Sequence, residues 1–239
     1  MNTPLIVGCP VWKREWIMPA WFEHVERAAQ NAAVVPHYVF VTDTFKDTTV
    51  GVLMDEAARR NRNVDIVHFE QDDREDKRDW PRKGRLELMV ELRNALLARV
   101  REYEPGFFLS LDSDILLHLD AISSMLEETH RFDAVGGKCY MGYTGKKLPS
   151  CANLDVNGGM KNRHDADGAA YPKHVIMAIK LMLPQAYAID YEYSSKGEDI
   201  GWSIACRRAG LNLGWDAKVC SKHVMTREHL TQVDKRCGF

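Results

Sequence analysis

The 239-residue sequence predicts a single α/β domain with a central, mostly parallel β-sheet. The first observation is that short apolar runs alternate with helical periodicity through the first half of the chain, which is typical of a parallel sheet covered on both faces by helices. The second is the composition, with 45% hydrophobic and 28% charged residues, which is that of a soluble globular protein. The third is the length, which allows one large domain with a full-sized core.

The first half of the chain is predicted to contain four strands and three helices. The apolar runs predicted as strands cover residues 5–7, 37–42, 64–69 and 107–111. The helical patterns between them cover residues 16–33, 50–61 and 85–103. A charged loop is predicted over residues 70–83.

The second half of the chain is less regular. We predict a further strand at residues 134–136, a helix at 198–209 and a strand-like run at 217–220. Residues 141–172 are rich in glycine and polar side chains, which indicates a long loop. Long loops in compact domains tend to be functional, so this half is expected to carry an irregular part of the site.

The bulk properties argue against several classes of protein. The net charge is −2, so no overall basic field attracts nucleic acid or an acidic membrane. No stretch reaches the roughly 18 apolar residues of a transmembrane segment, and the N-terminus lacks the pattern of a signal peptide. The six cysteines include no C-x-x-C pair, which argues against a zinc knuckle. We therefore expect reduced thiols and a cytoplasmic protein, with a surface disulfide as the alternative.

Asp112 and Asp114 directly follow the predicted strand 107–111. In an open parallel sheet, ligands bind at the carboxyl ends of the strands, and residues two apart in an extended chain project to the same face. Both carboxylates are therefore expected to face one hard cation such as Mn²⁺ or Mg²⁺, which binds carboxylates together with substrate phosphates. The alternative is an acidic turn that only ends the strand.

Arg93 lies on the apolar face of the predicted helix 85–103. That face is formed at helical spacing by Leu86, Met89, Val90, Leu96, Leu97 and Val100. A buried guanidinium without a partner is costly, so Arg93 is expected to meet an anion. The two candidates are a nucleotide diphosphate and a structural ion pair with Asp112 or another acid at a strand end.

Glu198 and Asp199 are expected at the start of the predicted helix 198–209. Ser195 and Glu198 have the spacing of a capping box, and the helix dipole favours the negative charge of Asp199 in the first turn. This structural role competes with a second one, in which Asp199 is a general base that takes a proton from an acceptor hydroxyl. His223, after the run 217–220, is either a packed side chain or a metal ligand that joins Asp114.

Taken in order along the chain, these segments resemble the GT-A glycosyltransferases, most closely their inverting, family-two-like group. The first strand with Pro10 and Arg14 is similar to the nucleotide-contacting first loop of that family, and Asp43 stands where the family places a carboxylate against the base or ribose. The other matching segments are Lys83-Gly84 with Arg93-Asn94, Asp112-Ser113-Asp114, Gly197-Glu198-Asp199 and Val219 to His223.

The resemblance implies a single GT-A type, Rossmann-like domain over residues 1–239. Residues 1–118 would form the nucleotide-sugar-binding half, and residues 119–239 the irregular acceptor-binding half that carries the catalytic base. The nucleotide sugar, with a UDP-sugar as the expected donor, would be bound by Pro10, Arg14, Asp43, Lys83, Arg93 and Asp112. The Mn²⁺ or Mg²⁺ ion would be bound by Asp112, Asp114 and His223.

The catalytic residues implied by the resemblance are Asp199, as the base of an inverting transfer, and Glu198 beside it. The acceptor would be a glycan, a lipid-linked sugar or a protein. One alternative is transfer to hydroxylated bases of DNA, because basic residues are frequent over 74–101 around Trp80, although acidic residues interleave with them. Another is a module that binds a nucleotide sugar or glycan without turnover. A sugar nucleotidyltransferase is disfavoured because no glycine-rich loop follows the first strand.

Overall fold

The computed structural model describes residues 5–42, 48–69, 82–141, 148–149, 151–154, 160–161, 174–176 and 178–232. Asp43, most of the predicted charged loop 70–83 and much of the predicted loop 141–172 lie outside these ranges.

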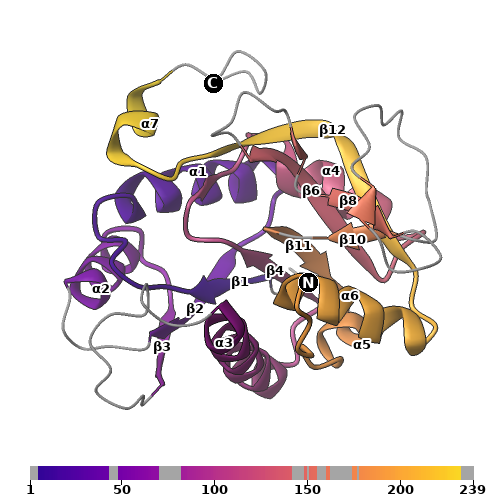
Figure 1. Cartoon of the computed structure of the whole chain (residues 1–239). Coiled ribbons are helices and arrows are strands. Elements are labelled where there is room, and N and C mark those ends of the chain that lie inside the picture. The colour runs from indigo at the N-terminus through magenta and orange to yellow at the C-terminus, as the bar shows by residue number, and fades with distance from the viewer. Residues whose placement is uncertain are drawn as a thin grey trace.

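A mixed β-sheet runs through the centre of the molecule (Figure 1). Its strands are β1 (Leu5–Pro10), β2 (Pro36–Thr42), β3 (Val64–His68), β4 (Phe107–Leu111), β5 (Ile115–Leu116), β6 (Ala134–Met141), β7 (Leu148–Pro149), β11 (Ile179–Met182) and β12 (Leu213–His223). Their order is β3-β2-β1-β4-β11-β6-β12-β5, and β7 pairs with β6. The first four strands are parallel, as are β6 and β12, while β11 runs antiparallel between β4 and β6.

Helices cover both faces of this sheet. The helices are α1 (Met18–Asn31), α2 (Thr49–Arg59), α3 (Arg82–Tyr103), α4 (Ala121–Glu128), α5 (Pro184–Tyr187), α6 (Glu198–Arg208) and α7 (Arg227–Thr231). On one face α1 contacts both α2 and α4, and on the other α3 contacts α6; Figure 1 shows α3, α5 and α6 in its lower half. The sheet is therefore a buried middle layer, as the continuous apolar strands of the first half predict.

The period of two along β2 divides the core between the two faces. Tyr38 and Phe40 point toward α1, where they pack against Phe22, whose ring centroid lies 4.6 Å from that of Tyr38. Val39 and Val41 point the other way and join the cluster under α3 and α6. Each face of the sheet thus has its own apolar cluster.

The structure confirms the predicted α/β class and most elements, and it corrects others. The predicted strand at 134–136 extends to Met141, and the predicted helix at 85–103 begins three residues earlier, at Arg82. The predicted loop 141–172 contains strands β8 (Cys151–Leu154) and β9 (Met160–Lys161), which form a small sheet with β10 (His174–Ile176). Strand β11 was not predicted, because it has only four residues and one of them is a lysine.

Within the described residues, no helix is long and apolar enough to cross a membrane. Cys9, Cys139 and Cys206 are buried, and none of the three takes part in a disulfide, as expected for reduced thiols. Cys220 instead takes part in a disulfide, which is the alternative that the sequence left open.

Candidate functional site

A cavity of about 370 Å³ opens at the carboxyl ends of β1 and β4. It is lined by Pro10, Val11, Trp12, Arg14, Val41, Arg85, Leu88, Met89, Leu92, Arg93, Asp112, Ser113, Asp114 and Glu198. Its wall combines apolar side chains with a few charged groups of both signs, which is the usual make-up of a small-molecule site. Strand ends of an open α/β sheet are also where ligands of such folds bind.

Arg93 lies at the floor of this cavity and is only 2% exposed. Its Nη2 lies 2.5 Å from Oδ1 of Asp112, and its Nη1 donates a hydrogen bond to Oγ of Ser110 at 3.1 Å. Burial alone would lower the pKa of Arg93, but the charge of Asp112 and the nearby acids outweigh it and raise the pKa well above its ordinary value. The prediction that Arg93 is buried beside an anion is therefore confirmed, with Asp112 as that anion.

Asp114 faces a cation on one side and a histidine on the other. Its Oδ2 lies 3.4 Å from Nη2 of Arg14, and its Oδ1 lies 3.5 Å from Nε2 of His223. Burial would raise the pKa of Asp114, but the hydrogen bond and charge of His223, with the charge of Arg14, lower it overall. The pairing of His223 with Ile115 across β12 and β5 brings the ring to Asp114.

The Nδ1 atom of His223 is buried and has no hydrogen-bond partner in the described part of the chain. Among the described residues, no three histidine, cysteine, aspartate or glutamate side chains gather at metal-binding spacing. Asp112 is turned toward Arg93, so the expected convergence of both carboxylates on one cation is not the arrangement seen here. Asp114 and His223 remain close enough to act as a pair of ligands.

Asn94, next to Arg93, holds the segment that leads to the second acidic pair. Its side-chain amide donates to the carbonyl oxygen of Tyr191 at 3.0 Å, and its oxygen accepts from the amide of Tyr191 at 2.7 Å. The Tyr191 ring stacks on Trp202 of α6, with the ring centroids 5.8 Å apart. Arg93 and Asn94 thus connect α3 with the strand-end acids and with α6, respectively.

Helix α6 begins at Glu198, with Gly197 as its N-cap at φ +138°. The predicted capping box is wrong, since Ser195 is not the N-cap and no side chain caps this end. The left-handed conformation that glycine allows starts the helix two residues later than a serine cap would. Glu198 and Asp199 lie in the first turn, as predicted, where the dipole favours their charge.

Glu198 and Asp199 face different surroundings. Glu198 lines the cavity, with Oε1 3.9 Å from Nη2 of Arg93, and burial followed by the charge of Asp199 raises its pKa. Asp199 instead forms an ion pair with Nζ of Lys180, a fully buried residue in the middle of β11. Sequence reasoning missed Lys180, although a lysine within the apolar run 179–182 carries the same signal as Arg93 on its apolar stripe.

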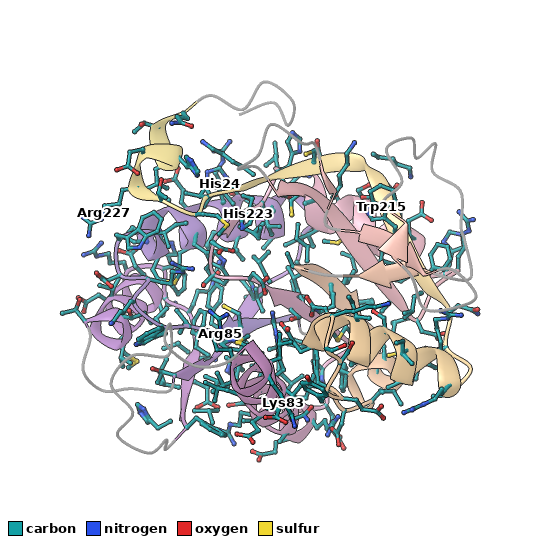
Figure 2. The ribbon with its side chains drawn as sticks, in the orientation of Figure 1. His24, Lys83, Arg85, Trp215, His223 and Arg227 are labelled. Atoms are coloured by element: carbon teal, nitrogen blue, oxygen red, sulfur yellow. The ribbon has the colours of Figure 1, made fainter. Side chains whose placement is uncertain are left out.

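The remaining predicted residues divide into three groups. Pro10 and Arg14, predicted to contact the nucleotide, line the cavity. Lys83 is exposed, lies 3.6 Å from Glu87, and is not among the cavity-lining residues, whereas Arg85 is one of them. Figure 2 labels Lys83 and Arg85 near the start of α3, and His223 at the end of β12. Asp43 lies outside the described residues.

No protein-family model and no curated protein matches the sequence. The fold does match solved structures, which confirms the GT-A type, Rossmann-like fold class predicted from the sequence. S. aureus TarS 1–349 in complex with UDP-GlcNAc matches with a TM-score of 0.60 and 13% identity, over 98% of this chain and 62% of that chain. The chain thus spans less than two thirds of the TarS structure.

Two further structures have similar likeness. Mannosyltransferase PcManGT from Pyrobaculum calidifontis, solved with GDP-Man and Mn²⁺, matches with a TM-score of 0.55 and 11% identity, over 95% of this chain and 58% of that chain. A nucleoside-diphosphate-sugar pyrophosphorylase from Vibrio cholerae matches with a TM-score of 0.53 and 10% identity, over 95% of this chain and 98% of that chain. At such identities the likeness establishes the fold.

Proposed function

We propose that this protein is a metal-dependent glycosyltransferase that moves a sugar from a nucleotide-sugar donor to an acceptor hydroxyl, with inversion at the anomeric carbon. The observation that carries the proposal is the cavity at the ends of β1 and β4, where Arg14 and Arg93 stand beside Asp112 and Asp114. Guanidinium groups bind phosphate well, and carboxylates with a histidine bind divalent metals.

The metal in this proposal is Mn²⁺ or Mg²⁺, with Asp114 and His223 as its nearest protein ligands and Asp112 as a further contact. The residues fit such an ion, because Nε2 of His223 and Oδ1 of Asp114 lie 3.5 Å apart, close enough for one cation to contact both. Such ions commonly take one or two carboxylates and leave other positions to substrate phosphates and water. When bound, the metal would neutralise charge on the leaving diphosphate.

The base in this proposal is Asp199, with Glu198 beside it at the cavity wall. Lys180 forms an ion pair with Oδ1 of Asp199, which fixes the position of the carboxylate. Glu198 has a raised pKa, so it holds its proton to higher pH than an ordinary glutamate and can donate a hydrogen bond in the cavity. The two neighbouring acids thus have surroundings that suit different tasks.

The donor in this proposal is a nucleoside-diphosphate sugar, with UDP-sugars the first to test. Structures of similar fold hold UDP-GlcNAc or GDP-Man, which makes both nucleotides part of the screen. The acceptor is a glycan, a lipid-linked sugar or a protein. Some of the basic residues that suggested hydroxylated DNA as an acceptor lie outside the described residues. DNA is therefore included in the acceptor screen because of the amino-acid sequence of this chain alone.

The test is a screen of nucleotide sugars for hydrolysis and transfer with Mn²⁺, with wild type, Asp114→Asn and Asp199→Asn side by side. We expect Asp199→Asn to bind the donor as wild type does and to lose transfer by about 10²–10⁴-fold, as for a general base. Intact transfer in Asp199→Asn would remove the base assignment. A wild type inactive toward every nucleotide sugar would favour the binding-only module.

A second candidate is a sugar nucleotidyltransferase, since the match to the V. cholerae pyrophosphorylase covers 95% of this chain and 98% of that chain. Against it, no glycine follows Gly8 until Gly51, so β1 is not followed by a glycine-rich phosphate loop. The products separate the two reactions. Glycosyl transfer releases a nucleoside diphosphate, whereas nucleotidyl transfer from a nucleoside triphosphate to a sugar phosphate releases pyrophosphate.

A further inference from the structure

Lys180 lies in the middle of the sheet, on the strand next to β4. It belongs to β11, where it pairs with Ser110 of β4 on one side and Gly136 of β6 on the other. Its side chain has 0% exposure, the lowest of the buried basic side chains in the described residues. A lysine in such a place would be expensive without an anion, so its contacts should explain why it is there.

The contact that neutralises Lys180 is an ion pair with Oδ1 of Asp199 at the start of α6. The ammonium group also lies over the Tyr191 ring, 5.6 Å from the ring centroid, while Arg93 lies 5.9 Å from the same centroid. Burial alone would lower the pKa of Lys180, but the charge of Asp199 outweighs it and raises the pKa. The lysine is therefore a permanent cation at neutral pH.

Lys180 does not line the cavity, in contrast to Arg93. It cannot reach a donor or acceptor from its buried place, so its effect on any reaction passes through Asp199. Asp199 does not line the cavity either, but 14% of its side chain is exposed, and the lysine holds only one of its oxygens. The other oxygen is left for a different partner.

We propose that Lys180 is a positioning residue for the reaction, which holds Oδ1 of Asp199 and leaves Oδ2 to accept the proton of the acceptor hydroxyl. This inference rests on the proposed function. In the step it serves, the acceptor oxygen forms a bond to the anomeric carbon, the bond from that carbon to the diphosphate oxygen breaks, and the hydroxyl proton moves to Asp199. The lysine gives up no proton and stays a cation throughout.

The charged and titratable groups around this pair come from several elements, and each contributes to its pH dependence. They are Arg93 of α3, Asp112 after β4, Tyr191 before α6, and Glu198 and Cys206 of α6. The like charge of Arg93 lowers the pKa of Lys180, whereas the opposite charge of Asp112 raises it. Both stay unchanged in the variants below, so a shift on removal of Lys180 reports its own charge.

The experiment compares the pH dependence of kcat/KM in wild type, Lys180→Met and Lys180→Arg, with the nucleotide sugar that the screen identifies. Without its cation, the ionised form of Asp199 is less favoured in a buried place. The acid limb of the Lys180→Met profile is therefore expected to move up by about 1 pH unit or more. We expect kcat at neutral pH to fall by about 10-fold or more while donor binding is unchanged. Lys180→Arg should keep the acid limb at its wild-type pH.

A control and a second neutral variant keep the test decisive. Lys218→Met removes an exposed lysine on β12 that pairs with Glu128 at 3.2 Å, and it should leave the profile unmoved. Lys180→Gln keeps a hydrogen-bond donor to Asp199, so it serves where Lys180→Met does not stay folded at the assay temperature. It should show the same shift.

The outcomes separate this inference from the function on which it rests. A wild type that transfers, together with a folded Lys180→Met or Lys180→Gln whose acid limb and kcat match wild type, overturns the role of Lys180 alone. An equal loss in Lys180→Arg and Lys180→Met with no shift of the acid limb also overturns it, because that pattern indicates a packing role. A wild type without transfer to any acceptor overturns both proposals.

Discussion

The two acidic pairs of the candidate site are supported in different ways. Asp112 and Asp114, at the end of β4, contact Arg93 and Arg14, and both arginines line the cavity. Asp199, at the start of α6, contacts a lysine that is fully buried and does not line the cavity. Both regions balance charge, but Asp199 does so with a cation that an incoming ligand cannot touch.

This difference suggests a division of labour. An arginine at a cavity wall can exchange a carboxylate for a phosphate, or bind both, because its planar fork has five donors. A lysine buried within the sheet, such as Lys180, cannot contact an incoming ligand and therefore holds only its neighbouring carboxylate. The strand-end pair is thus suited to binding a charged ligand, and the helix-start pair to holding one group in a constant position and charge state.

The largest expected effect is on the strand-end pair. Asp114→Asn removes the carboxylate proposed to bind the metal beside His223, so transfer should fall by about 10³-fold, the equivalent of several kcal/mol. The measurement is the transfer rate across a Mn²⁺ titration, in which excess metal should recover part of the loss. If Asp114→Asn matches wild type at every Mn²⁺ concentration, the strand-end pair does not bind the metal.

The next largest effect is on the free energy of unfolding, and it differs between the two buried cations Lys180 and Arg93. Lys180→Met leaves Asp199 unpaired in a largely buried place, so we expect the free energy of unfolding to fall by about 3–5 kcal/mol. Arg93→Met should cost somewhat less, because the Asp112 side chain is 30% exposed and partly solvated. Denaturant unfolding measures both changes.

Donor binding then distinguishes the two variants. Titration calorimetry with UDP should show weaker binding in Arg93→Met and unchanged binding in Lys180→Met. The double variant Lys180→Met/Asp199→Asn should recover part of the lost stability, because it removes the unpaired charge. Equal losses of UDP affinity in the two single variants would contradict the distinction between Arg93, which a ligand can contact, and Lys180, which it cannot.

A smaller effect is expected at Gly201, which lets the helix-start pair approach the preceding segment. A Cβ atom there would lie 1.9 Å from the carbonyl oxygen of Glu192, so Gly201→Ala should push α6 away and cost about 1–3 kcal/mol. Gly51→Ala, in α2, is the matched control. Nothing lies within 4 Å of its Cβ, and it should stabilise the protein by about 0.5–1 kcal/mol.

Thermal unfolding and transfer rates test this pair of alanine variants together. Gly201→Ala should lower both stability and transfer, because the backbone that Asn94 holds at Tyr191 continues into the crowded segment. A Gly201→Ala variant as stable and active as Gly51→Ala would show that α6 tolerates a shift, and the constant position inferred for Asp199 would lose its support.

The buried contact of the strand-end pair and the place of Glu198 and Asp199 in a first helical turn could be predicted from the sequence, but the contact of Asp199 with Lys180 could not. Asp112 follows a strongly apolar strand and Arg93 interrupts an apolar helix face, so local pattern alone predicts a buried pair. The contact of Lys180 with Asp199 depends on a short antiparallel strand inserted between β4 and β6, a tertiary feature without a local signal. The start of α6 at Gly197 likewise depends on a left-handed φ that competes with a good serine cap.

The smallest expected effect concerns the two basic residues at the start of α3. The resemblance assigned donor binding to Lys83, but the structure has Lys83 exposed beside Glu87 and Arg85 at the cavity wall. One exposed charge contributes about 0.2–1 kcal/mol, so Arg85→Ala should weaken UDP binding by about 1.4- to fivefold. Lys83→Ala should leave it unchanged. A larger loss of UDP affinity in Lys83→Ala than in Arg85→Ala would mean that Lys83 contacts the donor. The donor site would then extend beyond the residues that line the cavity.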